Sequence, residues 1–209
     1  MNYNDFKTER ECVAYFMRRL YQNQLTTCSG GNLSMRLDEK HVIITPSSLD
    51  KGVIEAGEIG LVTIDGENLT PHLKSSIETG MHLEIFRRRP DVKAVVHAHP
   101  VMASTFAAVD KDINTTLTAE SYLVLGNVVN APYALMGSKE LSVIVGKAAE
   151  NSNVIVMKNH GITTVGKSML DAFDKMELLE ASAKMTINAA ILGGVSPLTA
   201  EQRAQLDNW

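Results

Sequence analysis

The pattern of apolar and polar positions predicts helices that alternate with short strands. In residues 4–22, apolar side chains recur at the spacing of an amphipathic helix, with a charged face outward. Further helices are expected over residues 77–88, over 138–150 and over 168–192, where Gly193 and Gly194 end the last one. Pro100 is well placed to begin a short helix.

Short runs rich in β-branched residues predict strands between these helices. They are expected over residues 33–37, 41–45, 60–64, 128–133, 154–158 and 161–165, and in the apolar run that begins at Ala94. Asp65-Gly66 is typical of a hairpin turn. Hairpins join antiparallel strands, so we expect a mixed α/β fold, residues 1–209 forming a single domain with a largely antiparallel central sheet flanked by helices.

Composition limits the classes of function. The chain has 209 residues, 44% of them hydrophobic and 21% charged, which suits one globular core. A formal net charge of −4 disfavours a nucleic-acid or anionic membrane surface as partner. Residues 1–10 are polar and lack the apolar core of a signal peptide, and no apolar run approaches membrane-spanning length, so we expect a cytoplasmic protein.

Two histidines separated by one residue follow an apolar run in the stretch 94–100, Ala-Val-Val-His-Ala-His-Pro. In an extended strand this spacing points His97 and His99 to the same face, as one metal ion requires. His160 lies between two expected strands, where Gly161 could allow a tight turn that aims it inward. Three neutral imidazoles with an open position are the pattern of catalytic zinc. Ordinary structural histidines are the alternative.

Glu78 begins the helix that precedes the histidine strand. Antiparallel packing could bring its carboxylate to a metal, as a fourth ligand or as a proton-transfer group. From spacing alone, a solvated carboxylate that favours the helix dipole is expected instead.

Three clusters of small polar residues are candidates for holding a phosphate. A net-negative protein can bind phosphate locally through backbone N–H groups, hydroxyls and a helix N-terminus. The candidates are Ser29, Gly31 and Asn32, then Thr45, Ser47 and Ser48, then Ser75 and Ser76.

Residues 161–168, Gly-Ile-Thr-Thr-Val-Gly-Lys-Ser, satisfy the nucleotide-binding P-loop pattern and precede a helix. The four residues between the glycines are β-branched and favour an extended strand, whereas a phosphate cradle needs a compact loop. We therefore interpret Gly166 as a turn before the long helix and expect no nucleotide site.

Five motifs in order resemble the class II aldolase/adducin family over nearly the whole chain. They are Ser29-Gly30-Gly31-Asn32-Leu33-Ser34, Ile44-Thr45-Pro46-Ser47, Lys74-Ser75-Ser76-Ile77-Glu78, Val95-Val96-His97-Ala98-His99 and Asn159-His160-Gly161. Their joint occurrence in this order is specific, although no single motif is.

The resemblance implies one Zn²⁺ per subunit, held by His97, His99 and His160. Glu78 would complete the metal shell and move a proton when substrate binds. The phosphate would be bound among the small polar residues Gly31, Asn32, Ser47, Ser48, Ser75 and Ser76. The family implies a homotetramer with active sites at the interfaces between subunits, and a sugar phosphate as small-molecule partner.

The activity implied is a zinc-dependent aldolase that cleaves a ketose 1-phosphate, with L-fuculose 1-phosphate expected, to dihydroxyacetone phosphate and L-lactaldehyde. Alternatives on the same fold are a pentulose-5-phosphate 4-epimerase, a methylthioribulose-1-phosphate dehydratase and a 5-deoxypentulose-phosphate aldolase. From another class, a non-catalytic adducin-like binding module is the alternative.

The sequence departs from the family pattern at two places. Ile77 stands where the family often has a second serine before the glutamate, and Ser48 stands where it often has glycine. On the aldehyde side the resemblance implies a tyrosine from a neighbouring subunit, to which either Glu120 or Tyr122 can be aligned.

Overall fold

The strands form one seven-stranded sheet in the order β3-β2-β1-β4-β7-β6-β5. A computed structural model describes residues 6–208. All neighbouring strands are antiparallel except the parallel pair β5 and β6. The strands are β1 (Asn32–Arg36), β2 (His41–Ile44), β3 (Gly60–Thr63), β4 (Ala94–Ala98), β5 (Val128–Ala131), β6 (Val154–Met157) and β7 (Gly161–Gly166). The expected α/β fold with a largely antiparallel sheet is confirmed.

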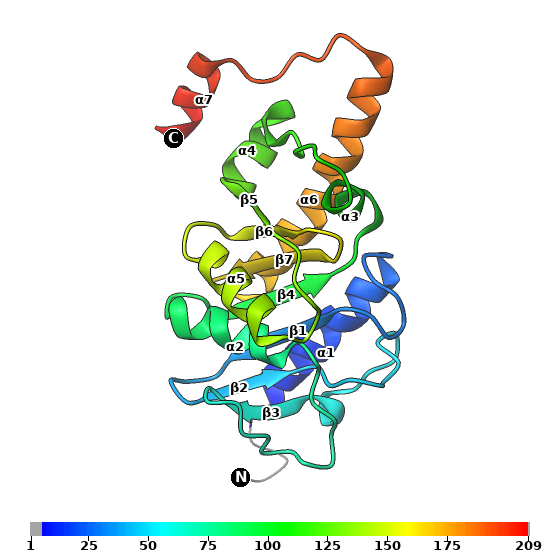
Figure 1. The fold of residues 1–209 in the computed structure, drawn as a ribbon, viewed down its shortest axis with the longest axis vertical. Helices are drawn as coiled ribbons and strands as arrows, with labels where there is room; N and C mark the ends of the chain where they lie inside the picture. Colours follow the sequence, from blue (N-terminus) through cyan, green and yellow to red (C-terminus); the bar gives the residue numbers. More distant parts are fainter. Residues whose placement is uncertain (1–5, 209) are drawn as a thin grey trace.

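Helices cover both faces of this sheet (Figure 1). Helix α2 packs beside α5 on one face, and α1, α3 and α6 contribute to the core on the other. The helices are α1 (Lys7–Gln22), α2 (Thr79–Arg88), α3 (Val101–Ala107), α4 (Ala119–Leu125), α5 (Lys139–Ala149), α6 (Met169–Leu192) and α7 (Ala200–Asp207), with single 3-10 turns at η1 (Ala56–Glu58) and η2 (Thr115–Leu117).

Strand β4 lies at the centre of the sheet, paired with β1 and β7. Its side chains alternate: Ala94 and Val96 belong to the core beneath α1 and α6, and Val95 belongs to the core beneath α2 and α5. Both faces are covered, which explains why an uninterrupted apolar run leads into the first histidine.

Most predicted elements are present within a few residues of their expected bounds. The first helix begins at Lys7, and Asn4 and Asp5 lie outside the described residues. Helix α3 begins at Val101 with Pro100 as its cap. After Asp65-Gly66 the chain makes only an isolated bridge to β3, so no full hairpin forms there. The prediction contained neither α4 nor α7.

The stretch with the P-loop pattern is a strand. Residues Gly161–Gly166 form β7, which pairs with β4 and β6 along its length. Its backbone N–H groups are used in the sheet and cannot surround a phosphate, as the β-branched residues predicted.

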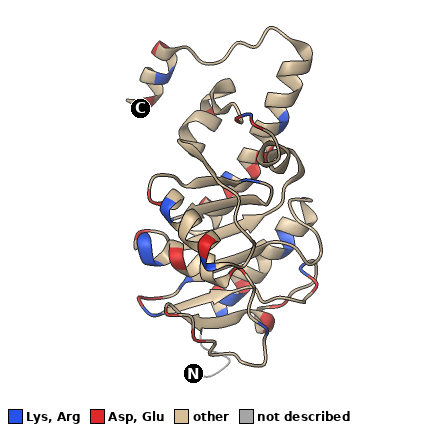
Figure 2. Ribbon diagram, viewed as in Figure 1, with Lys and Arg blue, Asp and Glu red and all other residues tan. Residues whose placement is uncertain are grey.

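Charged residues of both signs are interspersed over the described ribbon (Figure 2). This distribution agrees with the modest net charge and offers no broad basic face. Within residues 6–208, every helix is too short or too polar to traverse a lipid bilayer.

Candidate active site

One edge of the sheet gathers the chain segments that carry the predicted site. Asn32 begins β1, while Ala98 ends the adjacent β4, and β6 turns into β7 next to it. In antiparallel neighbours the start of one strand lies beside the end of the other. The register therefore sets Asn32 opposite His97, with Thr163 on the other side.

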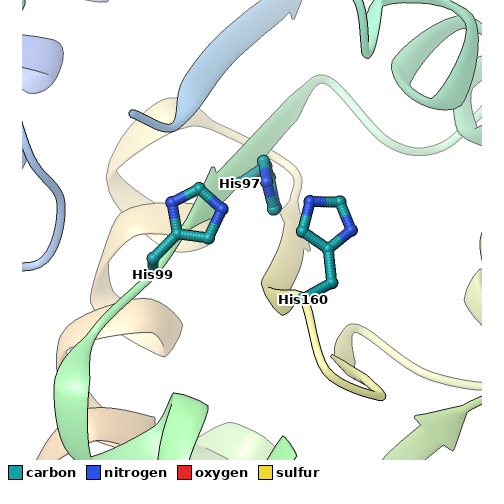
Figure 3. Close-up of side chains that lie close together, drawn as sticks. All are labelled: His97, His99 and His160. Atoms are coloured by element: carbon teal, nitrogen blue, oxygen red, sulfur yellow. The ribbon is translucent and has the colours of Figure 1, made fainter. Parts of the chain in front are cut away.

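His97, His99 and His160 come together at this edge, where one nitrogen of each lies within 4.8 Å of the others. His97 is the penultimate residue of β4, His99 follows that strand, and His160 lies in the turn between β6 and β7. Figure 3 shows the three rings turned toward a common space. The expectation that His97 and His99 share one side is met, although β4 ends before His99.

A backbone carbonyl fixes the orientation of the buried His97 ring. Nδ1 of His97 lies 2.9 Å from the carbonyl oxygen of Ile162, which can only accept, so Nδ1 carries the proton. Nε2, the nitrogen left to act as a ligand, faces Glu78. Metal-binding histidines in proteins are held in this way.

Gly161 was predicted to allow the tight turn before β7, but the left-handed residue of that turn is Asn159. The φ angle of Asn159 is 53°. Gly161 begins β7, and a Cβ at this position would lie 2.6 Å from Cδ2 of His99 and 2.7 Å from the carbonyl oxygen of Ala98. Its bare backbone leaves the space that the His99 ring occupies.

Glu78 is buried, so the expectation of a solvated carboxylate from spacing alone is wrong. Its side chain is 7% exposed, and the residue precedes α2 as its N-cap. Oε2 lies 3.2 Å from Nε2 of His97 and accepts a hydrogen bond of 2.7 Å from Asn32. Oε1 lies 2.8 Å from Nε2 of His160.

A fourth histidine, His82, holds Asn32 in place. His82 is completely buried on α2, with Nε2 2.5 Å from Oδ1 of Asn32 and Nδ1 2.6 Å from the hydroxyl of Ser34. The Asn32 amide group donates to Glu78 and to Ser76, so its oxygen faces His82, which must carry its proton on Nε2. His82 therefore connects α2 to β1 through both of its ring nitrogens.

The ionisation states in this group suit a metal site. Burial raises the pKa of Glu78. The imidazoles of His97 and His160 and the amide of Asn32 lower it by more than burial raises it, so the pKa lies well below its usual range. Burial, followed by the nearby His97 and His160, lowers the pKa of His99 to about 4. Burial lowers the pKa of His82 to about 3.

Three buried atoms in this group have no well-aligned hydrogen-bond partner among the described residues: Nε2 of His97, Nδ1 of His160 and Oε1 of Glu78. Buried polar atoms without partners are rare in proteins and call for an explanation. Neutral imidazoles with an ionised carboxylate are the donors that zinc and similar divalent cations take. The residues present therefore fit a divalent metal ion.

A cavity of about 410 Å³ opens beside Glu78, His99 and His160. Five of the predicted phosphate residues line it: Gly31, Asn32, Ser47, Ser48 and Ser76. Ser29 lines it too, whereas Ser75 does not. The Thr45 hydroxyl accepts from the backbone N–H of Leu33, which indicates a structural role.

Ser48 adopts the left-handed conformation, with φ of 64°. This backbone geometry explains why glycine is the residue that often stands at this place in the family pattern.

Two lysines of the cavity wall, Lys51 and Lys74, were not among the predicted site residues. Lys51 is 1% exposed, whereas Lys74 is exposed. A lysine three residues after Ser48 carries no local signal of burial, because its environment comes from loops distant in the sequence.

Glu120 and Tyr122 lie on α4, outside the cavity wall. The Tyr122 hydroxyl donates to the carboxylate of Asp207 on α7, at 2.9 and 3.1 Å from its two oxygens. The chain's own fold does not bring these residues to the histidines, and their assignment across a subunit boundary stays a prediction.

Comparison with known proteins accords with this geometry. The family model of the class II aldolase and adducin N-terminal domain matches residues 11–187. A solved L-fuculose 1-phosphate aldolase superposes with a TM-score of 0.87 at 30% identity, covering 98% of this chain and 95% of that one.

Curated relatives have two different activities in their names. The chain is 35% identical over 166 residues to the L-fuculose phosphate aldolase of Methanococcus maripaludis (strain C7), covering 79% of this chain and 89% of the relative. It is 31% identical over 203 residues to the 3-oxo-tetronate 4-phosphate decarboxylase of Escherichia coli O6:H1 (strain CFT073), covering 94% of each. The chain belongs to the class II aldolase and adducin family and is a metal-dependent lyase.

Proposed function

We propose that this protein is a zinc-dependent aldolase that reversibly cleaves a ketose 1-phosphate, with L-fuculose 1-phosphate as substrate and dihydroxyacetone phosphate and L-lactaldehyde as products. The observation that carries the proposal is the buried, ionised Glu78 beside three histidines at the wall of a hydroxyl-lined cavity. A non-catalytic binding module would not need an ionised carboxylate buried against histidines.

The proposed ligands of the metal are His97, His99 and His160, with Glu78 as a fourth. When bound, zinc supplies a Lewis acid that stabilises negative charge on substrate oxygens. Glu78 delivers a proton to C3 of the substrate after the C3–C4 bond breaks, and removes it in the reverse direction. Asn32 orients the carboxylate by its hydrogen bond to Oε2. On the aldehyde side, Tyr122 or Glu120 of a neighbouring subunit handles the proton of the C4 oxygen.

The phosphate occupies the cavity end formed by Gly31, Asn32, Ser47, Ser48 and Ser76 in this proposal. Ser75 lies outside the cavity wall and contributes at most through its backbone. The names of the methanogen relative and of the similar solved structure support L-fuculose 1-phosphate as substrate.

Decarboxylation of a 3-oxo-tetronate 4-phosphate is the second candidate, because the relative with that name aligns over 94% of both chains. Loss of CO₂ from such a 3-oxo acid leaves the same carbanion equivalent as aldol cleavage, and protonation at C2 gives dihydroxyacetone phosphate. Glu78 can serve both reactions, since each ends with proton transfer to the carbon next to a carbonyl group.

The test is a panel of sugar phosphates incubated with the zinc-loaded protein. Dihydroxyacetone phosphate is measured with a coupled reductase, and L-lactaldehyde and CO₂ are measured separately, because both candidates release the same triose phosphate. Equal amounts of triose phosphate and L-lactaldehyde from L-fuculose 1-phosphate support the aldolase. Release of CO₂ from 3-oxo-tetronate 4-phosphate, with no cleavage of L-fuculose 1-phosphate, supports the decarboxylase.

The panel also separates the other enzymes that share the fold. Turnover confined to a pentulose 5-phosphate, a methylthioribulose 1-phosphate or a 5-deoxypentulose phosphate would replace the proposal by the epimerase, the dehydratase or the related aldolase. Stoichiometric zinc without turnover of any sugar phosphate would favour a binding module.

We also propose a homotetramer with active sites at the subunit interfaces. Large apolar side chains are exposed on two segments that reach the cavity, Ile77 on one and Tyr133, Leu135 and Met136 on the other, and we call these four residues the mouth patch. Ile77 and Met136 line the cavity itself. Contact with a second copy would bury this surface and complete the aldehyde side.

A further inference from the structure

Lys51 is an unusual residue at the cavity because its long charged side chain is almost completely buried. It is 1% exposed and is among the largest fully buried side chains of the described residues. It also lines the cavity, together with Pro46, Ser47 and Ser48 of the same loop. Lysine is rarely buried in proteins unless its charge has a partner.

The ammonium group of Lys51 has little to compensate its charge. Its Nζ donates to the carbonyl oxygen of Pro46, and no Asp or Glu in residues 6–208 forms an ion pair with it. An ammonium group has three N–H donors, so two remain for another acceptor. Burying a cation is unfavourable unless an anion or several hydrogen bonds compensate it.

Backbone hydrogen bonds place Lys51 where the three loops of the cavity meet. Its N–H donates to the carbonyl of Cys28 at 2.7 Å, and the N–H of Ser47 donates to the carbonyl of Lys74 at 2.9 Å. Ser47 and Ser48 line the cavity, and no other described residue hydrogen-bonds to their hydroxyls. A fixed cation and two free hydroxyls at one end of a cavity form an arrangement suited to a tetrahedral anion.

We propose that Lys51 is the counter-ion of the substrate phosphate and that it makes the cavity selective for dianionic phosphate monoesters over uncharged sugars. This inference rests on the proposed function, since it concerns the same cavity. Lys51 stabilises the bound anion, whereas in the empty protein only the longer-range attraction of Glu58 offsets the cost of burying its charge. Lys74 contributes less, because its exposed side chain is screened by water.

Binding of inorganic phosphate tests the inference without any turnover. Titration calorimetry at constant ionic strength compares the wild type with Lys51→Met, which has nearly the same shape without the charge. Lys184→Met is the matched control, because Lys184 is an exposed residue of α6 away from the cavity. The dissociation constant for phosphate is expected to rise about 10- to 100-fold in Lys51→Met and less than twofold in Lys184→Met.

Unfolding in urea separates this role from a purely structural one. Without phosphate, Lys51→Met should unfold at the same or a higher urea concentration than the wild type, since a buried charge that no ion pair compensates has been removed. A given phosphate concentration should raise the midpoint of the wild type and raise that of Lys51→Met by much less. A residue that only fastened the loop through Pro46 would give a destabilised variant with normal phosphate affinity.

Three results would overturn the inference: no phosphate binding by the wild type, equal binding by Lys51→Met, or an equal loss in Lys184→Met. If Lys51→Met does not fold, Lys51→Gln keeps a donor for Pro46 and removes only the charge, and its phosphate affinity decides in the same way. If the wild type binds phosphate through Lys51 but turns over no ketose phosphate, the proposed function is wrong and this inference still holds.

Discussion

Glu78 is the side chain on which the proposed chemistry depends, because its carboxylate contacts His97 and His160 and also lines the cavity. Glu78→Gln keeps the shape of the side chain and an acceptor for Asn32, but its amide cannot take up and release a proton as the carboxylate does. We expect kcat for triose phosphate release to fall about 10²- to 10⁴-fold, while the dialysed variant retains about one zinc per chain through the three imidazoles.

His99→Ala is the matched comparison, because it removes a proposed metal ligand and keeps Glu78. We expect this variant to lose zinc on dialysis, as measured by elemental analysis, along with its activity. Wild-type kcat in Glu78→Gln would contradict the proton-transfer role, and full zinc content in His99→Ala would contradict the ligand role.

Lys51 should also make stability depend on alkaline pH. Burial lowers its pKa to about 8 from 10.5, against the opposing effect of Glu58. The unfolded chain therefore binds more protons between these two values, and the free energy of unfolding rises with pH across that window. In phosphate-free buffer, the wild type should gain up to about 3 kcal/mol relative to Lys51→Met between pH 7.5 and 10.5. Urea unfolding at several pH values measures this difference, and parallel curves would contradict it.

Ser48 shows how backbone conformation selects residues in the cavity loop. Its φ of 64° is unfavourable for a residue with a Cβ. Ser48→Gly should raise the free energy of unfolding by about 0.5–1 kcal/mol, after allowance for the greater entropy of glycine in the unfolded chain. Ser47→Gly is the control: its φ is not positive, so it should destabilise. Urea titration compares the two, and stabilisation by both would show that the conformation is not the cause.

At the scale of elements, the site depends on where β4, β7 and the loops end. Gly161 matters because β7 begins directly against the His99 ring. Gly161→Ala would place a methyl group 2.6 Å from that ring and 2.7 Å from a rigid carbonyl oxygen. We expect the variant to displace His99 and to lose zinc affinity about 10-fold or more, since the orientation of a ligand controls binding.

Gly80→Ala is the control for that substitution. Gly80 lies on α2 close to Glu78 in sequence, but its added methyl group would meet only the flexible hydroxyl of Ser142, at 3.2 Å. Alanine also favours a helix over glycine. Zinc titration of both folded variants checks the expectation, and equal affinities would show that β7 tolerates the methyl group.

The sequence predicted those elements whose signal is local. Runs such as Val154–Met157 and the amphipathic α1 follow from periodicity alone. Helix α7 had a usable signal, the capping box from Thr199 to Gln202, that the prediction did not use. The burial of Glu78 and Lys51 had none, because it depends on Asn32, His82 and loops that only the folded sheet brings together.

At the scale of the whole molecule, the cavity lies next to surface that a lone chain leaves exposed. In the mouth patch, Tyr133 is 60% exposed and Leu135 is 66% exposed. Several large apolar side chains exposed close together along the chain, beside a cavity, are typical of an interface. Tyr122 and Glu120 lie on α4, outside the wall of the cavity in their own chain, and in the proposal they act at the site of a neighbouring chain.

The oligomeric state can be tested through Leu135. Light scattering after size exclusion should give about four times the chain mass of 22.8 kDa for the wild type. Leu135→Glu places a charge in the proposed interface, which is costly to desolvate, so it should dissociate the tetramer. Activity should fall with dissociation, while zinc content stays near one per chain because the proposed ligands come from a single chain. Leu135→Ala, which adds no charge, should remain tetrameric. A Leu135→Glu protein with wild-type mass and activity would place the interface elsewhere, and a monomeric wild type with full activity would remove the need for a residue from a neighbouring subunit.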